Sequence, residues 1–113
     1  MNKSSLSQLK CQPCSGSTPK LTSDEIQYKL TEVNKWELNE NQEMIFKKFT
    51  FKTFNKALNF SNLVGKIADE EGHHPDISLG WGYCLIMIHT HAIKGLSIND
   101  FILASKIDKI DFQ

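Results

Sequence analysis

The chain has 113 residues, of which 40% are hydrophobic, so it is long enough for one domain with a core of its own. Its 13 basic residues are all lysine and balance 13 acidic residues, which argues against a nucleic-acid partner and against a strongly anionic substrate. No apolar run could span a bilayer, and the N-terminus lacks the apolar middle of a secretory signal, so we expect a cytoplasmic protein without a membrane partner.

Residues 1–20 are rich in Ser, Gly and Pro and predict a flexible leader that packs little, followed by a single domain over residues 21–113. The leader holds Cys11 and Cys14 in a C-x-x-C spacing, and the third cysteine lies far away, so a disulfide framework is not expected. A zinc knuckle is the alternative, but zinc takes about four ligands. We therefore favour a loosely docked arm.

The first helix is predicted from "LTSDEI", where Thr22 can cap the helix and Glu25 can bond back to it. We expect this helix to run to about Asn34. The next segments, "KWELNE" and "EMIFKKFTF", are rich in aromatic and β-favouring residues and predict two strands of a hairpin around the polar turn at 39–41.

A long helix is predicted from Thr53 to a left-handed cap at Gly72. Its apolar and small residues recur at spacings of three and four, which predicts one buried face. The members of that face are Phe54, Ala57, Leu58, Ser61, Val64 and Ala68.

A second hairpin is predicted from "DISLG" and "GYCLIMIHTH", with Trp81 at the turn. Alternation places Cys84, Ile86, Ile88 and Thr90 on one face and Tyr83, Leu85, Met87, His89 and His91 on the other. Both faces are largely apolar, so we expect the second one to be covered by another subunit.

The last helix repeats the start signal of the first, because in "LSINDF" Ser97 can cap and Asp100 stands three residues further on. The element order is therefore α-β-β-α-β-β-α. This order predicts an α+β domain in which one four-stranded antiparallel sheet carries three helices packed on a single face.

The stretch "DEEGHHPDI" concentrates groups that can transfer protons. Residues 69–71 place three carboxylates at a helix C-terminus, where negative charge is mildly destabilising but favours protonated imidazoles nearby. His73 and His74 follow directly, and Pro75 restricts the backbone so that the two rings project in fixed directions. A preorganised acid-base pair is one interpretation, and a solvated His-His turn is the other.

A second stretch, "THAIKGLSIND", places His91 where a strand is expected to end beside a helix N-terminus. The alternative is a partly exposed strand-end histidine without a role. Asp100 is explained by the capping box, which we take as its primary role. His89 shares a strand face with His91, but the histidine spacings match no familiar metal-ligand pattern, so no metal is expected.

Together, "HHPDI" and "THAIKGLSINDF" closely resemble the pterin-4a-carbinolamine dehydratase family over residues 21–110. The resemblance implies that His73, His74 and His91 line a pterin pocket. The family commonly has Glu four residues before the first of these histidines, where this chain has Asp69. The residues that the resemblance places in substrate-binding or supporting positions are Asp69, Glu70, Pro75, Asp76, Thr90 and Asp100.

The implied reaction dehydrates 4a-hydroxytetrahydrobiopterin to quinonoid dihydropterin and needs no cofactor and no metal. One group donates a proton to the departing hydroxyl and another accepts one from a ring nitrogen, which histidine can do near neutral pH. The assignment that we test has His73 and His91 exchanging the protons while His74 positions the ring.

The resemblance also implies a homodimer or homotetramer and a place in tetrahydrobiopterin recycling, with an aromatic amino acid hydroxylase pathway as a partner system. Two alternatives remain open. The domain could be a protein-interaction module like the coactivators among its animal relatives, or an accessory protein of a molybdopterin pathway.

Overall fold

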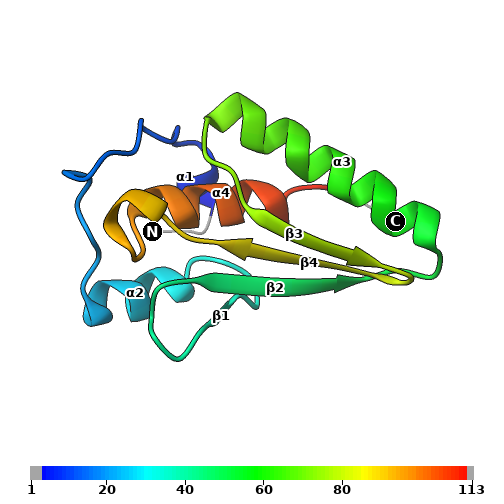
Figure 1. Ribbon diagram of the computed structural model, residues 1–113, viewed down its shortest axis with the longest axis horizontal. Coiled ribbons are helices and arrows are strands. Elements are labelled where there is room, and N and C mark those ends of the chain that lie inside the picture. The colour runs from blue at the N-terminus through cyan, green and yellow to red at the C-terminus, as the bar shows by residue number, and fades with distance from the viewer. Residues whose placement is uncertain (1–3, 112–113) are drawn as a thin grey trace.

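The computed structural model describes residues 4–111 and confirms the α+β class and the predicted element order, with one short helix added in front (Figure 1). A 3-10 turn, η1, is also added before the last helix. The elements are α1 (Ser4–Ser7), α2 (Ser23–Leu30), β1 (Glu37–Leu38), β2 (Ile45–Thr50), α3 (Phe54–Glu71), β3 (Asp76–Gly80), β4 (Tyr83–Ile88), η1 (His91–Ile93) and α4 (Ile98–Asp108).

The four strands form one antiparallel sheet in the order β1-β2-β4-β3, so both predicted hairpins are confirmed and β4 pairs on both sides. Ile45 lies opposite Ile88, and Phe49 lies opposite Cys84. The face that carries these residues is buried against α2, α3 and α4, and the other face of β4 is half-buried. The predicted inward alternation along β4 is therefore confirmed.

Helix α2 begins as predicted but ends four residues earlier than expected. The Thr22 amide donates to Glu25 Oε1 at 2.8 Å, and the Glu25 amide donates to Thr22 Oγ1 at 3.2 Å. After Leu30 the chain leaves the helix, and the Asn34 amide instead donates to Asp108 Oδ2 of α4 at 2.9 Å. A tertiary hydrogen bond thus replaces the last helical turn.

Helix α3 begins after Thr53 and ends at Gly72, whose φ of 67° gives the predicted left-handed cap. Its buried face is Ala57, Phe60, Val64 and Ala68. The prediction missed Phe60 and wrongly included Phe54 and Leu58, which are 45% and 37% exposed. Phe60 is drawn inward because its ring packs against Phe49, at a centroid distance of 4.5 Å.

The leader packs more than its composition predicted, and the expectation of little packing is wrong for residues 6–12. Helix α1 lies beside α4 (Figure 1), and Leu6 and Cys11 are buried in the core. The Gln12 amide donates to Asn99 Oδ1 at 3.0 Å, and Asn99 Nδ2 donates to the Gln12 carbonyl at 2.8 Å. Across residues 4–111, no helix combines the length and apolar character that a membrane span requires.

Candidate active site

His73 lies immediately after the left-handed cap of α3, and the turn aims its ring into the protein. The backbone amide of His73 bonds to the Ala68 carbonyl at 3.3 Å, which fixes the residue against the helix end. The side chain is only 6% exposed, and its Nε2 lies 2.6 Å from Asp100 Oδ1. The two halves of the sequence pattern therefore meet at a buried histidine-aspartate pair.

Asp100 is fully buried in the first turn of α4 and has more hydrogen-bond partners than a helix cap needs. Its Oδ2 accepts from the Ser97 amide at 2.9 Å and from Thr90 Oγ1 at 2.8 Å, and Thr90 Oγ1 lies 2.8 Å from Ser97 Oγ. A carboxylate only accepts, so His73 Nε2 donates to it, and Nδ1 carries the lone pair whenever the ring is neutral. The capping role of Asp100 is confirmed, and Asp100 also orients the His73 ring.

His74 lies in the opposite environment from its neighbour. Its side chain is 62% exposed and its Nε2 lies 2.9 Å from Asp69 Oδ1, on a side chain that is 81% exposed. Such a surface pair contributes about 0–1 kcal/mol. Asp69, which stands where the family commonly has Glu, therefore contacts His74. The pair can hold the His74 ring in place at the surface.

His91 lies in η1 and not at the end of β4, because the strand ends at Ile88. Thr90 forms an isolated antiparallel β-bridge with Gly95, and the chain turns between these two residues. Thr90 is buried and His91 is exposed. The His91 ring packs edge-on against His89, with ring centroids 4.3 Å apart. The hydrogen bonds that join His73, Asp100, Thr90 and Ser97 do not include His91.

The remaining predicted residues lie around this network. Asp76, at the start of β3, has its Oδ2 3.5 Å from His89 Nε2 and is largely exposed. Half-buried Pro75 connects His74 to that strand. The Glu70 side chain is exposed, and its backbone carbonyl accepts from Lys10 Nζ at 3.0 Å. The structure thus joins His73, Thr90 and Asp100 directly and places the other predicted residues next to them in sequence or on the surface.

Glu71 is a half-buried residue whose role the sequence analysis missed, and its side chain is only 7% exposed. Its carboxylate accepts from the Cys11 amide at 2.9 Å and pairs with Lys106 at 3.1 Å and Lys10 at 3.7 Å. Burial alone raises the pKa of Glu71, but the Cys11 amide and the two lysines outweigh this and hold the pKa below its usual value. Glu71 therefore fastens the leader to α3 and α4.

The leader also brings two cysteines close to the site. Burial and the neighbouring Glu71 carboxylate raise the pKa of Cys11 to about 12. Cys14 is exposed, and its Sγ lies 3.5 Å from His73 Nδ1 and 3.2 Å from Asn99 Nδ2. The C-x-x-C spacing was the only signal for these residues, and it did not show what they contact.

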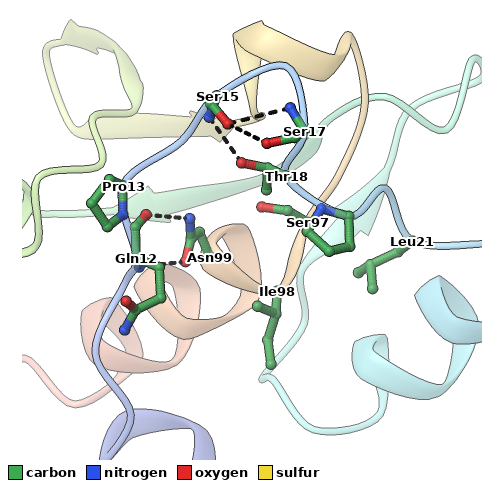
Figure 2. Close-up of a pocket in the computed structure, with 10 residues that line it drawn as sticks. Gln12, Pro13, Ser15, Ser17, Thr18, Leu21, Ser97, Ile98 and Asn99 are labelled. Atoms are coloured by element: carbon green, nitrogen blue, oxygen red, sulfur yellow. Dashed lines mark hydrogen bonds between the residues drawn. The ribbon is translucent and has the colours of Figure 1, made fainter.

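A cavity of about 360 Å³ lies between the leader and the start of α4. Figure 2 shows Gln12 and Asn99 facing each other across two hydrogen bonds at one side, while Ser15, Ser17 and Thr18 form a polar cluster at another. Its lining includes Ser97 and Asn99, but none of the three predicted histidines. Within residues 4–111, no three His, Cys, Asp or Glu side chains are grouped to hold a metal ion.

The fold and the buried pair define an α+β domain with a histidine-aspartate site between α3 and α4. The sequence profile of the family described as pterin 4 alpha carbinolamine dehydratase matches residues 19–110. The chain belongs to this family.

The sequences of related proteins match this chain over nearly its whole length. A protein of Methylococcus capsulatus is 44% identical over 110 residues, covering 97% of this chain and 96% of the relative. A protein of Rickettsia canadensis is 47% identical over 104 residues, covering 91% and 94%. The names of both relatives assign them provisionally to the pterin-4-alpha-carbinolamine dehydratases.

Two solved structures share the fold. A transcriptional coactivator/pterin dehydratase from Brucella melitensis superposes with a TM-score of 0.74 at 26% identity, over 79% of this chain and 95% of that one. A pterin dehydratase-like protein identified as a RuBisCO assembly factor has a TM-score of 0.57 at 22% identity, over 66% and 87%. The second likeness concerns the fold alone.

Proposed function

We propose that this protein catalyses the dehydration of 4a-hydroxytetrahydrobiopterin to quinonoid dihydropterin. The observation that carries the proposal is the buried His73-Asp100 pair, with 2.6 Å between Nε2 and Oδ1. An imidazole whose one nitrogen is held by a carboxylate has its other nitrogen oriented for proton exchange. Family membership supplies the substrate class.

The reaction removes one water from the substrate. A proton reaches the hydroxyl on the 4a carbon, the C–O bond breaks, and a neighbouring ring nitrogen releases its proton to the enzyme. His73 exchanges protons at Nδ1, because Nε2 is committed to Asp100. When Nδ1 takes up a proton, Nε2 keeps its hydrogen bond to the Asp100 carboxylate, so the ring stays in the same orientation through the proton exchange.

His91 is the second proton-exchange group in this proposal, and His74 positions the pterin ring. Two features support these roles. His91 directly follows Thr90, whose hydroxyl is bonded to Asp100, and its ring is exposed and open to a ligand. His74 is held by Asp69 at the surface, one residue from His73. Asp69, Glu70, Pro75, Asp76 and Thr90 serve as supporting residues.

A direct assay tests the proposal. Synthetic 4a-carbinolamine is added to the purified protein, and the absorbance of the quinonoid product is followed against the uncatalysed rate. The wild-type protein is expected to accelerate product formation, and His73→Ala is expected to lose most of the acceleration. A wild-type protein that leaves the uncatalysed rate unchanged contradicts the proposal.

A second candidate function is protein interaction, because the similar protein from Brucella melitensis is described as a transcriptional coactivator as well as a pterin dehydratase. The half-buried side chains on the outer face of β4, including Tyr83, Leu85 and Met87, give such a module a surface. The same surface suits a homodimer or homotetramer. Light scattering measures the assembly, and the dehydration assay separates the enzyme from a module without activity.

The physiological setting in this proposal is the cytoplasm and tetrahydrobiopterin recycling, downstream of an aromatic amino acid hydroxylase. A hydroxylase would supply the carbinolamine, and a reductase would consume the quinonoid product. An accessory role in a molybdopterin pathway is the alternative, and it predicts no turnover of the carbinolamine in the same assay.

A further inference from the structure

Cys14 occupies a position that neither the proposed dehydration nor the fold requires. Its thiol is exposed at the surface of the docked leader, yet its Sγ lies 3.5 Å from Nδ1 of the buried His73. On another side, Asn99 Nδ2 donates to the same sulfur at 3.2 Å. The Gln12 carbonyl, another acceptor for the thiol, is farther away at 3.9 Å.

The two cysteines of the C-x-x-C do not form a matched redox pair. Cys11 is 7% exposed, its thiol donates to the Asn99 carbonyl at 3.5 Å, and burial raises its pKa to about 12. A thiol attacks as its thiolate, so Cys11 is a poor resolving partner for an oxidised Cys14. Chemistry at this motif therefore falls on Cys14 alone.

The groups around Cys14 match the requirements of an activated nucleophile. Asp100 holds the His73 ring through Nε2, so the Nδ1 lone pair faces the thiol and can accept its proton. The Asn99 amide donates to the sulfur as negative charge develops there. One accessible sulfur thus contacts both a base and an amide donor, and a carboxylate orients the base.

We propose that Cys14 is a modification site for small carbon electrophiles. We also propose that a group attached to Cys14 blocks the access of substrate to His73 Nδ1. The thiol proton passes to His73 Nδ1, the sulfur forms a bond to the electrophilic carbon, the leaving group departs as an anion, and His73 returns the proton to solvent. The product is a thioether, which has no proton to donate and adds bulk beside Nδ1. The second part of this inference rests on the proposed dehydratase function.

The test uses iodoacetamide, which adds a carbamidomethyl group and releases iodide, with peptide mass spectrometry to follow each cysteine. Cys14 in the folded wild-type protein is expected to react about tenfold faster than Cys14 in the denaturant-unfolded chain, because only the folded chain supplies the base. Cys11 and Cys84 are buried and are expected to stay unlabelled, which reports that the protein remains folded.

His73→Asn removes the base and is expected to slow Cys14 labelling by about tenfold. His74→Asn is the matched control, because it changes the exposed neighbour, and it is expected to leave the rate unchanged. Equal Cys14 rates in folded and unfolded wild type overturn the inference. Equal rates in wild type and a folded His73→Asn protein overturn it as well.

Labelling is measured without turnover, so it is independent of the dehydratase proposal. Wild-type protein labelled at Cys14 is expected to lose dehydration in proportion to the label, whereas iodoacetamide is expected to cause no loss in Cys14→Ser. Fast labelling that leaves dehydration intact overturns the proposed block of access to His73 Nδ1. Fast labelling of a protein that never dehydrates the carbinolamine overturns the proposed function and supports the reactive thiol.

Discussion

His73 and His74 are adjacent in the chain and differ in almost every physical respect. His73 is 6% exposed and bonded to the fully buried Asp100, whereas His74 is 62% exposed and bonded to the exposed Asp69. The turn at Gly72, with its φ of 67°, sends the first ring inward, and the extended backbone before Pro75 sends the second ring outward. Two imidazoles of one motif thereby lie in different environments.

The largest expected effect on stability comes from removing the buried carboxylate. Asp100→Ala leaves the Ser97 amide, the Thr90 hydroxyl and His73 Nε2 without their acceptor. We expect a loss of about 3–5 kcal/mol in the free energy of unfolding. Urea denaturation measures this loss, and a change below about 1 kcal/mol would show that the network contributes little.

Removing the carboxylate that fastens the leader is expected to have the next largest effect. Glu71→Gln weakens the bonds to the Cys11 amide, Lys10 and Lys106, at a cost of about 1–3 kcal/mol near neutral pH. The pKa of Glu71 is lower in the folded protein than in the unfolded chain. Its contribution to the free energy of unfolding is therefore fully present above the pKa that Glu71 has in the unfolded chain. This contribution is lost as the pH falls through the pKa that Glu71 has in the folded protein.

The pH dependence gives this prediction a sharp control. The stability difference between wild type and Glu71→Gln, measured by denaturation at several pH values, is expected to shrink in acid. A difference that stays constant from neutral to acidic pH contradicts the assigned role of the carboxylate.

A smaller effect is expected from the hydroxyl that links β4 to α4. Thr90→Val keeps the volume of the side chain but removes its hydrogen bonds to Asp100 and Ser97, at a cost of about 1–2 kcal/mol. Thr50→Val, at an exposed position of β2, is the matched control and is expected to stay within about 0.5 kcal/mol. Equal midpoints of thermal unfolding for the two variants would show that the hydrogen bonds of Thr90 do not stabilise the fold.

The smallest effect is expected in the exposed pair. Asp69→Ala removes the partner of His74 and is expected to change the free energy of unfolding by no more than about 0.5 kcal/mol. The same denaturation experiment compares it with Asp100→Ala. If Asp69→Ala lowers the free energy of unfolding as much as Asp100→Ala does, the exposed and the buried histidine-aspartate pairs contribute equally to stability, which contradicts the prediction.

Sequence reasoning predicted the features that local chemistry determines. The caps at Thr22 and Gly72 and the inward alternation of β4 are all present, because each depends on a few neighbouring residues. The α+β architecture followed from these elements. The two stretches that contain the histidines also contain Thr90 and Asp100, and the structure joins both of these residues with His73 in one hydrogen-bond network.

Features that depend on contacts distant in sequence were missed. The leader is polar in composition, so nothing in its pattern showed that Leu6 is buried and that Glu71, 60 residues from Cys11, binds its amide. The buried face of α3 was misplaced because the packing of Phe60 against Phe49 is tertiary. Asp100 was interpreted as a cap, and its second oxygen, facing His73, became visible only in the fold.

The kinetics of His73→Ala and His74→Ala test the central claim most directly, in the carbinolamine dehydration assay. If the buried ring transfers protons and the exposed ring positions the substrate, His73→Ala lowers kcat by about 10²–10⁴ with little change in KM. His74→Ala then mainly raises KM. Equal losses of kcat in the two variants would contradict the account.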